Sequence, residues 1–401
     1  MPPRTPDVIV VGGGAIGLAV AWRAAQGGLS VTVLERGELG EGASSVAAGM
    51  LAPVAEVEFG EAGRRLLDLG LRSAALWPAF AAELEEAAET GVQLRAGGTL
   101  LLARDEDEAR ELERQIALRE SLGLRALRLR ASAAREFEPA LAPTLRLALH
   151  APDDHSVDPR LLLAALRRAC ERAGVDIREH TPVAGVVLEP GGARGGDRGG
   201  APAGDRGGYR GGARVTGVRL RDGRSLPAGH TVLAAGAWTA ELDGLPEHAR
   251  VPVRPVKGQL LRLRDPAGPG LLRRVVRFHG GYLVPREDGR YVLGATSEER
   301  GFDPHVTAGA VHDLLRDAHE LLPGLSELAI EELCVGFRPG TPDNLPAIGP
   351  GELEGLHWAT GHYRNGILLT PLTAQLLARA LLGAPADLDG DGAHATPGVP
   401  A

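Results

Sequence analysis

Three glycines near the start of the chain constrain its fold more than any other feature. They follow an apolar run at residues 8–11, and Glu35 ends the next apolar run; the three are Gly12, Gly14 and Gly17. In a strand–turn–helix unit the first such glycine permits a tight turn, the second lets the backbone approach a pyrophosphate, and the third lets the helix pack on the strand. An acidic residue about 20 positions later hydrogen-bonds a ribose hydroxyl. The spacing therefore predicts an α/β fold that begins with a dinucleotide site.

The composition argues against several classes of protein. A chain of 401 residues suits two domains or one discontinuous pair. The net charge of −8 argues against a nucleic-acid partner, because neutralising phosphates requires a basic surface. Cys170 and Cys334 lack a metal-binding spacing, so we expect two buried thiols and no metal site. Residues 8–11 are too short for a signal-peptide core and no segment suits a membrane span, so we expect a cytoplasmic protein.

The pattern of apolar and polar residues predicts alternating helices and strands, followed by a strand-rich block. One helix is expected from Asp158, which suits an N-cap, with Pro159 in its first turn. Further helices are expected at residues 106–120, 307–322 and 367–382. Strands are expected at residues 98–103, 175–180, 183–188, 214–220, 231–238, 253–263, 275–285, 291–296 and 356–360.

We predict two domains, of which the first is discontinuous. The dinucleotide-binding domain comprises residues 1–55, 151–245 and 335–383, and the substrate domain comprises residues 56–150 and 246–334. Residues 190–213 consist mainly of Gly, Arg, Asp, Ala and Pro, which indicates a low-complexity hairpin insertion rather than an RNA-binding tract. Residues 384–401 are expected to form a disordered tail.

Two arginines and a tyrosine are candidates for binding a carboxylate. Arg338 lies at a strand end in a Pro and Gly turn, and Arg364 lies between two glycines at a helix entrance. Either guanidinium can present a planar fork to a carboxylate, and Tyr282 can donate its hydroxyl to the same anion. Free N–H groups of the helix expected from Ile367 would stabilise negative charge on a reduced cofactor. His362 is either a neighbour of that charge or a structural histidine, and no residue is assigned as an acid or base.

Two residue types occur almost nowhere else in the chain. Lys257 is the only lysine, and Met50 is the only methionine after the initiator. All other basic positions except the histidines are filled by arginine. The single lysine and the single internal methionine are each either retained because the side chain matters or present by chance. The sequence leaves both readings open.

Several motifs together resemble a known family. The chain is similar to glycine oxidase of the thiamine pathway, within the D-amino-acid oxidase group of FAD proteins, and the similarity spans residues 7 to about 382. The most specific motif is Gly361-His-Tyr-Arg-Asn-Gly-Ile-Leu-Leu369. The others lie at residues 12–17, 47–53, 255–259, 281–286, 294–296 and 336–343.

The resemblance implies a p-hydroxybenzoate-hydroxylase-like architecture, in which a Rossmann-type FAD-binding domain carries an inserted mixed β-sheet substrate domain. It implies oxidative deamination of a small amino acid, glycine, sarcosine or D-alanine, with oxygen as the electron acceptor and hydrogen peroxide as a product. The iminoacetate formed from glycine would supply the thiazole of thiamine. A homo-oligomer, and a tetramer in particular, is implied by the family alone.

The resemblance also implies contacts with FAD. Ala15 and Ile16 would meet the pyrophosphate, Glu35 and Arg36 the adenosine ribose, and Val183 the adenine side through its backbone. Along the flavin it places Ala43, Ser44, Ala48, Gly49 and Met50, and around its edge His362, Tyr363, Arg364, Asn365, Gly366, Ile367 and Leu368. Arg338 and Tyr282 would bind the substrate carboxylate, and Arg364 and Met50 would border that pocket.

The sequence departs from the family pattern at two places. Gly280 stands where the family has a histidine two positions before Tyr282, and His279 lies one residue earlier. Some sarcosine oxidases attach the flavin through a cysteine in the turn at residues 336–342, where this chain has none, so we expect non-covalent FAD. Two alternatives remain open: a D-amino-acid dehydrogenase or sarcosine oxidase-like enzyme, and a flavin-binding module that acts on a nucleic-acid-borne amine, against which the acidic charge counts.

Overall fold

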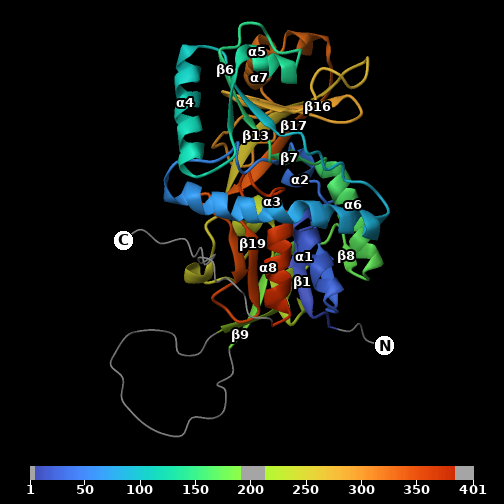
Figure 1. Ribbon diagram of the computed structural model, residues 1–401. Coiled ribbons are helices and arrows are strands. Elements are labelled where there is room, and N and C mark those ends of the chain that lie inside the picture. Colours follow the sequence, from blue (N-terminus) through green and yellow to red (C-terminus); the bar gives the residue numbers. More distant parts are fainter. Residues whose placement is uncertain (1–4, 191–212, 384–401) are drawn as a thin grey trace, which may run out of the picture.

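The computed structural model describes residues 5–190 and 213–383. Figure 1 shows two bodies stacked along the long axis of the molecule, with the helix α3 (Gly60–Ala88) crossing between them. The predicted insertion at residues 190–213, apart from its two end residues, and the predicted tail at residues 384–401 lie outside the described part.

The lower body in Figure 1 is built on a six-stranded sheet in the order β18–β19–β12–β1–β2–β8. Neighbouring strands pair in parallel except β18 and β19, which are antiparallel. The strands are β1 (Val8–Val11), β2 (Val31–Leu34), β8 (Asp176–Arg178), β12 (His230–Leu233), β18 (Ala347–Pro350) and β19 (Leu356–Thr360).

Both faces of this sheet are covered, which explains why β1 is apolar at every position. Val8 and Val10 pack against the helices, and Ile9 and Val11 pack against a three-stranded sheet on the other face. The helices are α1 (Ala15–Gln26), α6 (Pro159–Arg172) and α8 (Thr370–Leu381), together with part of α3. The covering strands are β9 (Val183–Pro190), β10 (Ala213–Leu220) and β11 (Ser225–Pro227).

The upper body is built on a mixed eight-stranded sheet in the order β17–β13–β16–β15–β14–β4–β6–β5. Its strands are β4 (Thr99–Ala103), β5 (Leu127–Arg130), β6 (Leu147–Ala151), β13 (Arg254–Arg264), β14 (Val275–Phe278), β15 (Gly281–Pro285), β16 (Arg290–Gly294) and β17 (Ala329–Gly340). The helices α5 (Ala131–Phe137) and α7 (Ala308–Leu321) share one hydrophobic cluster with the sheet, and α4 (Glu106–Ser121) shares another.

Short elements connect the two bodies. The helix α2 (Ala43–Val46) and the strand pair β3 (Met50–Leu51) and β7 (His155–Ser156) lie between them. Three 3₁₀ helices complete the described part, η1 (Gly236–Glu241), η2 (Glu247–Ala249) and η3 (Pro323–Glu327). The structure confirms the predicted α/β fold class, with one body on a mostly parallel sheet and a second body on a mixed sheet.

Local signals placed one helix accurately. The carboxylate of Asp158 accepts hydrogen bonds from the backbone N–H groups of Arg160 and Leu161, at 2.9 and 3.4 Å, and Pro159 occupies the first turn of α6. A carboxylate at the N-cap accepts hydrogen bonds from N–H groups that the first turn leaves unpaired. A proline in that turn has no N–H that would need a partner.

Three predicted elements are wrong in their limits. The helix expected from Ile367 begins at Thr370, because Pro371 has no N–H to donate and is accommodated only in a first turn. The strand expected at residues 231–238 ends at Leu233, where η1 follows. The strand expected at residues 275–285 is a hairpin, whose turn includes Gly280 with a φ of +89°.

The predicted domain limits cut two strands of the upper sheet. The predicted limit at residue 334 falls inside β17, which pairs with β13 along the run from Ala329 to Gly340. The limit at residue 150 falls inside β6. The division into domains therefore stays a prediction.

Of the two expected buried thiols, Cys170 is buried, and the expectation is wrong for Cys334, which is only partly buried.

Candidate functional site

A cavity of about 930 Å³ is lined by residues of both bodies and forms the candidate site. The lower body contributes the ends of β1 and β2 at Val11 and Leu34, and the upper sheet contributes Leu260, Tyr282 and Arg338. In open α/β sheets ligands bind outside the carboxyl ends of the parallel strands, where this cavity begins.

The glycine motif forms a cradle at one end of the cavity. Gly12 has a φ of +110°, and a Cβ there would lie 2.4 Å from the carbonyl oxygen of Ala234. A Cβ on Gly17 would lie 2.0 Å from the carbonyl oxygen of Gly12, so this glycine permits close packing of α1 on the strand and does not line the cavity. Gly14 precedes α1, and the N–H groups of the first turn face this end. The cradle fits a pyrophosphate.

Glu35 fixes the backbone of that cradle. Its Oε2 accepts a hydrogen bond from the N–H of Gly13 at 2.7 Å, and its Oε1 accepts one from Gly37 at 3.1 Å. A carboxylate has further lone pairs, so it can also accept from a ribose hydroxyl. The guanidinium of Arg36 lies over the ring of Trp238, 3.6 Å from the ring centroid. Trp238 also lines the cavity and was not predicted.

The small-residue loop after β2 brings backbone close to the cavity. The hydroxyl of Ser44 accepts from the N–H of Ala15 at 3.1 Å, which joins the loop to the start of α1. Gly49 has a φ of +79°, and a Cβ there would lie 2.1 Å from the carbonyl oxygen of Val157. Only glycine therefore fits at position 49. Gly49 and the next residue, Met50, both line the cavity.

The motif at residues 361–366 forms consecutive turns before α8. Tyr363 has a φ of +47°, and its N–H donates to the carbonyl oxygen of Pro339 at 3.0 Å. His362 is 3% exposed, and its Nε2 lies 3.0 Å from the hydroxyl of Thr373. Burial lowers the pKa of His362 to about 3, so the ring stays neutral and structural.

Most of the residues expected to contact the cofactor or substrate line this cavity. Gly17, Asn365 and Leu368 are the three that do not. The carbonyl oxygen of Leu368 accepts hydrogen bonds from the side chains of Ser73 and Trp77, at 2.6 and 2.8 Å, so Leu368 connects the turn to α3. Asn365 is buried, and its N–H donates to the carbonyl oxygen of His362 at 2.8 Å.

Arg338 and Tyr282 lie at the other end of the cavity, together with Arg364. Nη1 of Arg338 donates to the carbonyl oxygens of Thr296 and Lys257, at 3.0 and 3.4 Å. A Cβ on Gly258 would lie 2.5 Å from Nη2 of Arg338, so this glycine makes room for the guanidinium. Because carbonyl groups hold one side of the fork, the rest of it can meet a carboxylate.

Burial raises the pKa of the Tyr282 hydroxyl, while the nearby guanidinium groups lower it. The phenol therefore stays protonated and can donate a hydrogen bond to an anion. Two further lining residues, Arg277 and Glu56, act on the same hydroxyl and were missed in the sequence. No sequence pattern marks Arg277, which lies opposite Tyr282 because the two strands form a hairpin that was not predicted from the sequence.

The described residues form neither a metal site nor a membrane-spanning helix. Within residues 5–190 and 213–383, no group of three or more His, Cys, Asp or Glu side chains could hold a metal ion. None of the described helices combines the length and the apolar character needed to cross a membrane.

Comparisons with known proteins agree on a family. The model of a family described as FAD dependent oxidoreductase matches residues 7–380. A glycine oxidase of Geobacillus kaustophilus is 37% identical over 93% of this chain and 92% of its own length. A bifunctional ThiO/ThiG protein of Trichormus variabilis is 37% identical over 93% of this chain, which spans only 52% of the length of that relative. The crystal structure of the Geobacillus kaustophilus glycine oxidase superposes with a TM-score of 0.82, at 36% identity and with 96% of each chain covered.

Proposed function

The chain belongs to the family of FAD-dependent oxidoreductases, and from this premise we propose that it oxidises glycine and other small amines, such as sarcosine and D-alanine. The reaction converts the amine and oxygen to the imine and hydrogen peroxide; with glycine the imine is iminoacetate, which supplies the thiazole of thiamine or hydrolyses to the 2-oxo acid. The observation that carries the proposal is the position of Arg338 and Tyr282 in the same cavity as the glycine cradle.

The residues present fit a non-covalently bound FAD. A Cβ on Gly12 would overlap the backbone of Ala234, so the tight turn requires glycine, and the N–H groups at the start of α1 after Gly14 would face the pyrophosphate. Glu35 and Arg36 would hold the adenosine ribose, and Gly49 and Met50 would border the flavin. When bound, FAD supplies the acceptor for two electrons and a proton from the substrate carbon.

Arg338 and Tyr282 bind and orient the substrate in this proposal. The guanidinium pairs with the carboxylate through charge-assisted hydrogen bonds, and the protonated phenol donates to the same anion. Holding the reacting carbon in place supplies much of the rate enhancement, since positioning alone can lower a barrier by roughly 7–11 kcal/mol.

Among the described residues that line the cavity, His362 is the one histidine, and it is not suited to act as a base. The ring of His362 faces Thr373 and has a pKa of about 3, so it neither accepts nor delivers a proton near neutral pH. The amine is therefore oxidised in its neutral form, and activity should rise with pH as the substrate ammonium loses its proton. The cytoplasmic location and the homo-oligomer remain predictions.

The experiment is a peroxide assay on the purified yellow protein under air, with glycine, sarcosine, D-alanine and D-proline compared. Peroxide with glycine among the leading substrates supports the proposal. Bleaching of the flavin without peroxide identifies a dehydrogenase with another acceptor, and no bleaching with any of these amines overturns the substrate class.

Arg338→Ala is the matched test of the binding role. We expect kcat/KM for glycine to fall on the order of 10²–10³-fold, mainly through KM, because the substrate carboxylate loses its charge-assisted partner. Arg264→Ala, at the far end of β13 and paired with exposed Glu331, is the control and should leave KM unchanged. Unaltered kinetics in Arg338→Ala would remove this residue from the site.

A further inference from the structure

The substrate end of the cavity holds more positive charge than one carboxylate requires. Among the described residues, four charged side chains act on the Tyr282 hydroxyl, three of them arginines and one an acid: Arg277, Arg338, Arg364 and Glu56. All four line the cavity. A substrate such as glycine brings a single carboxylate, for which Arg338 is sufficient.

The hairpin places Arg277 beside Tyr282. The two residues are directly opposite in the register of β14 and β15. Opposite residues of an antiparallel pair project from the same face, with their Cβ atoms about 4.5–5.5 Å apart. Nη1 of Arg277 donates to the carbonyl oxygen of Ala55 at 2.8 Å, which holds one arm of the guanidinium. Its planar group has further N–H donors, which are available to an anion.

The acidic neighbours pair only loosely with these arginines. Oε1 of Glu56 lies 3.6 Å from Nη1 of Arg277, beyond hydrogen-bond distance, and Oε1 of Glu58 lies 3.9 Å from Nη1 of Arg364. Within the described part of the chain the Glu56 carboxylate accepts no hydrogen bond, although its side chain is only 18% exposed. Glu58 is exposed and screened by water. The buried Asp154 also acts on Arg277, but its oxygens accept hydrogen bonds from the N–H groups of Val54 and Ala55, so within the described residues no carboxylate is hydrogen-bonded to Arg277.

We propose that the preferred substrate carries a second carboxylate, on its nitrogen substituent or its side chain, and that Arg277 binds this group while Arg338 binds the α-carboxylate. This inference rests on the proposed amine oxidation. The chemistry at the reacting centre is unchanged: the amine is oxidised to the imine, oxygen is reduced to hydrogen peroxide, and the second carboxylate takes no part. Arg277 is then a specificity-determining residue.

The test compares each acid with its neutral isostere, so that size is constant and only charge differs. Iminodiacetate is paired with its monoamide, and D-aspartate with D-asparagine. We expect kcat/KM for at least one acid to exceed that of its amide by about tenfold or more, because a hydrogen bond to a charged group is stronger than one between neutral groups. The pair that shows the preference tells whether the acid belongs on nitrogen or on the side chain.

Two variants with opposite expected effects separate charge recognition from damage to the fold. Arg277→Gln should bring the acid-to-amide ratio close to one. Glu56→Gln removes a repelling carboxylate and should raise the ratio above that of the wild type. A general structural defect would not move the ratio in opposite directions. An unchanged ratio in Arg277→Gln overturns the inference.

An equilibrium measurement distinguishes this inference from the proposed function. Binding of malonate and of malonamate, which cannot be oxidised as amines, is followed by the change in flavin absorbance. Tighter binding of malonate that depends on Arg277 supports the anion site even if no amine is oxidised, which would overturn the proposed function alone. Glycine oxidation without preference for either acid or for malonate overturns the inference and leaves the proposed function intact.

Discussion

Lys257, the single lysine of the chain, shows how one buried side chain organises the substrate end of the cavity. Its Nζ donates to Asp303 Oδ2 at 2.8 Å and to the carbonyl oxygen of His305 at 2.6 Å. The backbones of Lys257 and Glu298 exchange two hydrogen bonds, at 2.9 and 3.0 Å. The lysine therefore holds the segment after β16, which carries the carbonyl group of Thr296 that contacts Arg338.

Lys257→Met is expected to lower stability and weaken substrate binding. The ammonium is fully buried while Asp303 is 31% exposed and can regain water, so we expect a loss of about 1–3 kcal/mol in the free energy of unfolding. KM for glycine should rise more than kcat falls, because the carbonyl of Thr296 no longer orients Arg338. Denaturant unfolding and steady-state kinetics measure both.

Arg300→Met is the control on the same segment, since its ion pair with Glu298 is at the surface. Surface pairs contribute about 0–1 kcal/mol, so its stability and KM should stay near those of the wild type. Equal changes in both variants would show that the segment, and not the buried ammonium, sets the position of Arg338.

Glu35 is a second residue with a separable role. In Glu35→Ala the N–H groups of Gly13 and Gly37 lose their acceptor, and each hydrogen bond to a charged group contributes about 1.5–3 kcal/mol. We expect the dissociation constant for FAD, measured by fluorescence quenching on the apoprotein, to rise tenfold or more. The exposed neighbour Glu38→Ala should leave it unchanged. An unaltered constant in Glu35→Ala would contradict the role of this residue.

Among the elements, α6 begins at a cap residue that also contacts side chains far away in the sequence. The buried carboxylate of Asp158 caps this helix and also lies 3.2 Å from Arg290, the first residue of β16, and 3.6 Å from Arg286, which directly follows β15. Arg286 is buried, and burial lowers its pKa to about 10. The cap was predicted from the sequence, but the arginines follow it by more than a hundred residues, and no local pattern joins them to it.

Asp158→Ala is expected to destabilise the protein more than Asp158→Asn. The asparagine retains an oxygen that can cap α6, and a cap contributes about 0.5–2 kcal/mol. Both variants leave Arg286 without its carboxylate, which is costly for a buried charge. The exposed N-cap Asp105 of α4, changed to Ala, provides the cost of a cap alone. Thermal unfolding of the four proteins should rank wild type, D105A, D158N and D158A in falling order of stability.

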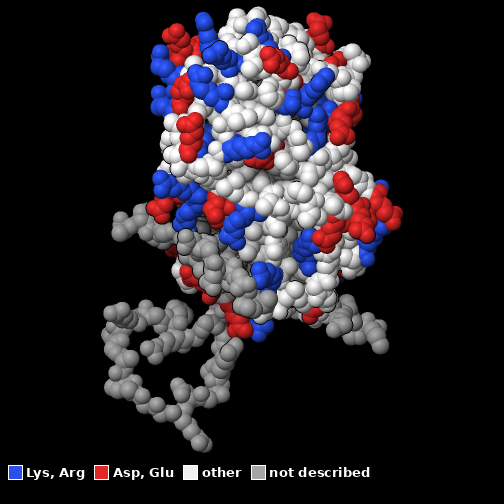
Figure 2. Space-filling view, in the orientation of Figure 1, with Lys and Arg blue, Asp and Glu red and all other residues white. Residues whose placement is uncertain are grey.

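At the scale of the whole molecule, the cavity exists only because two bodies meet. Its lining includes residues as far apart in sequence as Gly12, Tyr282 and Arg364. Charges of both signs are interspersed on the face shown in Figure 2, in keeping with a net charge of −8. Titratable groups inside the bodies, rather than this surface, are expected to set the response to acid.

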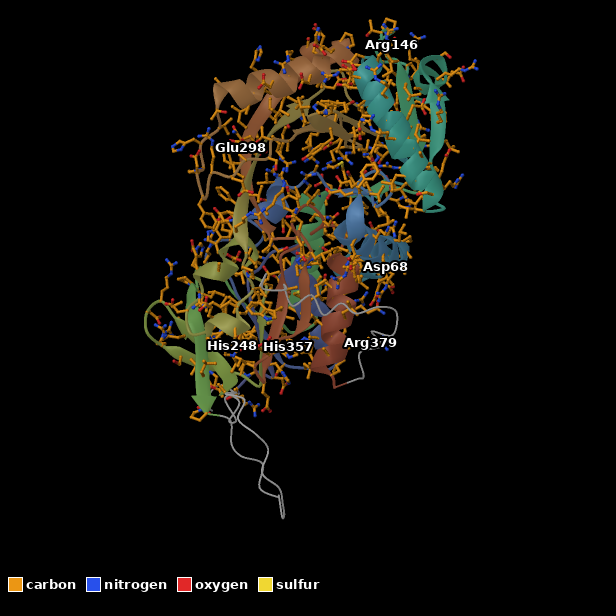
Figure 3. All side chains as sticks on the ribbon, turned by 90° about the vertical axis from the view of Figure 1, so that its left-hand side faces the viewer. Asp68, Arg146, His248, Glu298, His357 and Arg379 are labelled. Atoms are coloured by element: carbon orange, nitrogen blue, oxygen red, sulfur yellow. The ribbon has the colours of Figure 1, made fainter. Side chains whose placement is uncertain are left out.

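His357 gives the whole fold a defined sensitivity to acid. It lies in the lower body, well away from Glu298 in the upper body (Figure 3), and its Nε2 is 3.1 Å from Nδ1 of His230. Burial lowers the pKa of His357 to about 4, with His230 adding to the effect. The fold thus favours the neutral ring, and the stability this contributes is present above the unfolded pKa of about 6.5 and lost as pH falls toward 4.

The free energy of unfolding should therefore fall by about 2 kcal/mol from this residue between pH 7 and pH 5. Chemical denaturation across that range measures it. His357→Gln should flatten the profile in part, because burial lowers the pKa of His362 too and that ring remains. The exposed His312→Gln is the control and should leave the slope unchanged. A slope in His357→Gln equal to that of the wild type would assign the acid response to other groups.

Local sequence signals specified what depends on neighbouring residues: the glycine cradle from Gly12 to Gly17, the cap of α6 at Asp158, and the fold class. Backbone conformation and capping depend on a few neighbouring residues, so they can be predicted from the sequence. The start of α8 at Thr370 was misplaced because its apolar pattern begins before Pro371.

Tertiary structure alone decided which charges meet at the substrate end. Arg277 and Glu56 carry no distinguishing motif, and they reach Tyr282 only through strand register and the approach of the loop after β3. Lys257 stood out in the sequence as a singular residue, but its partner Asp303 is 46 positions away. Electrostatic contacts act through space, so their partners are determined when the two bodies pack, and not by distance along the chain.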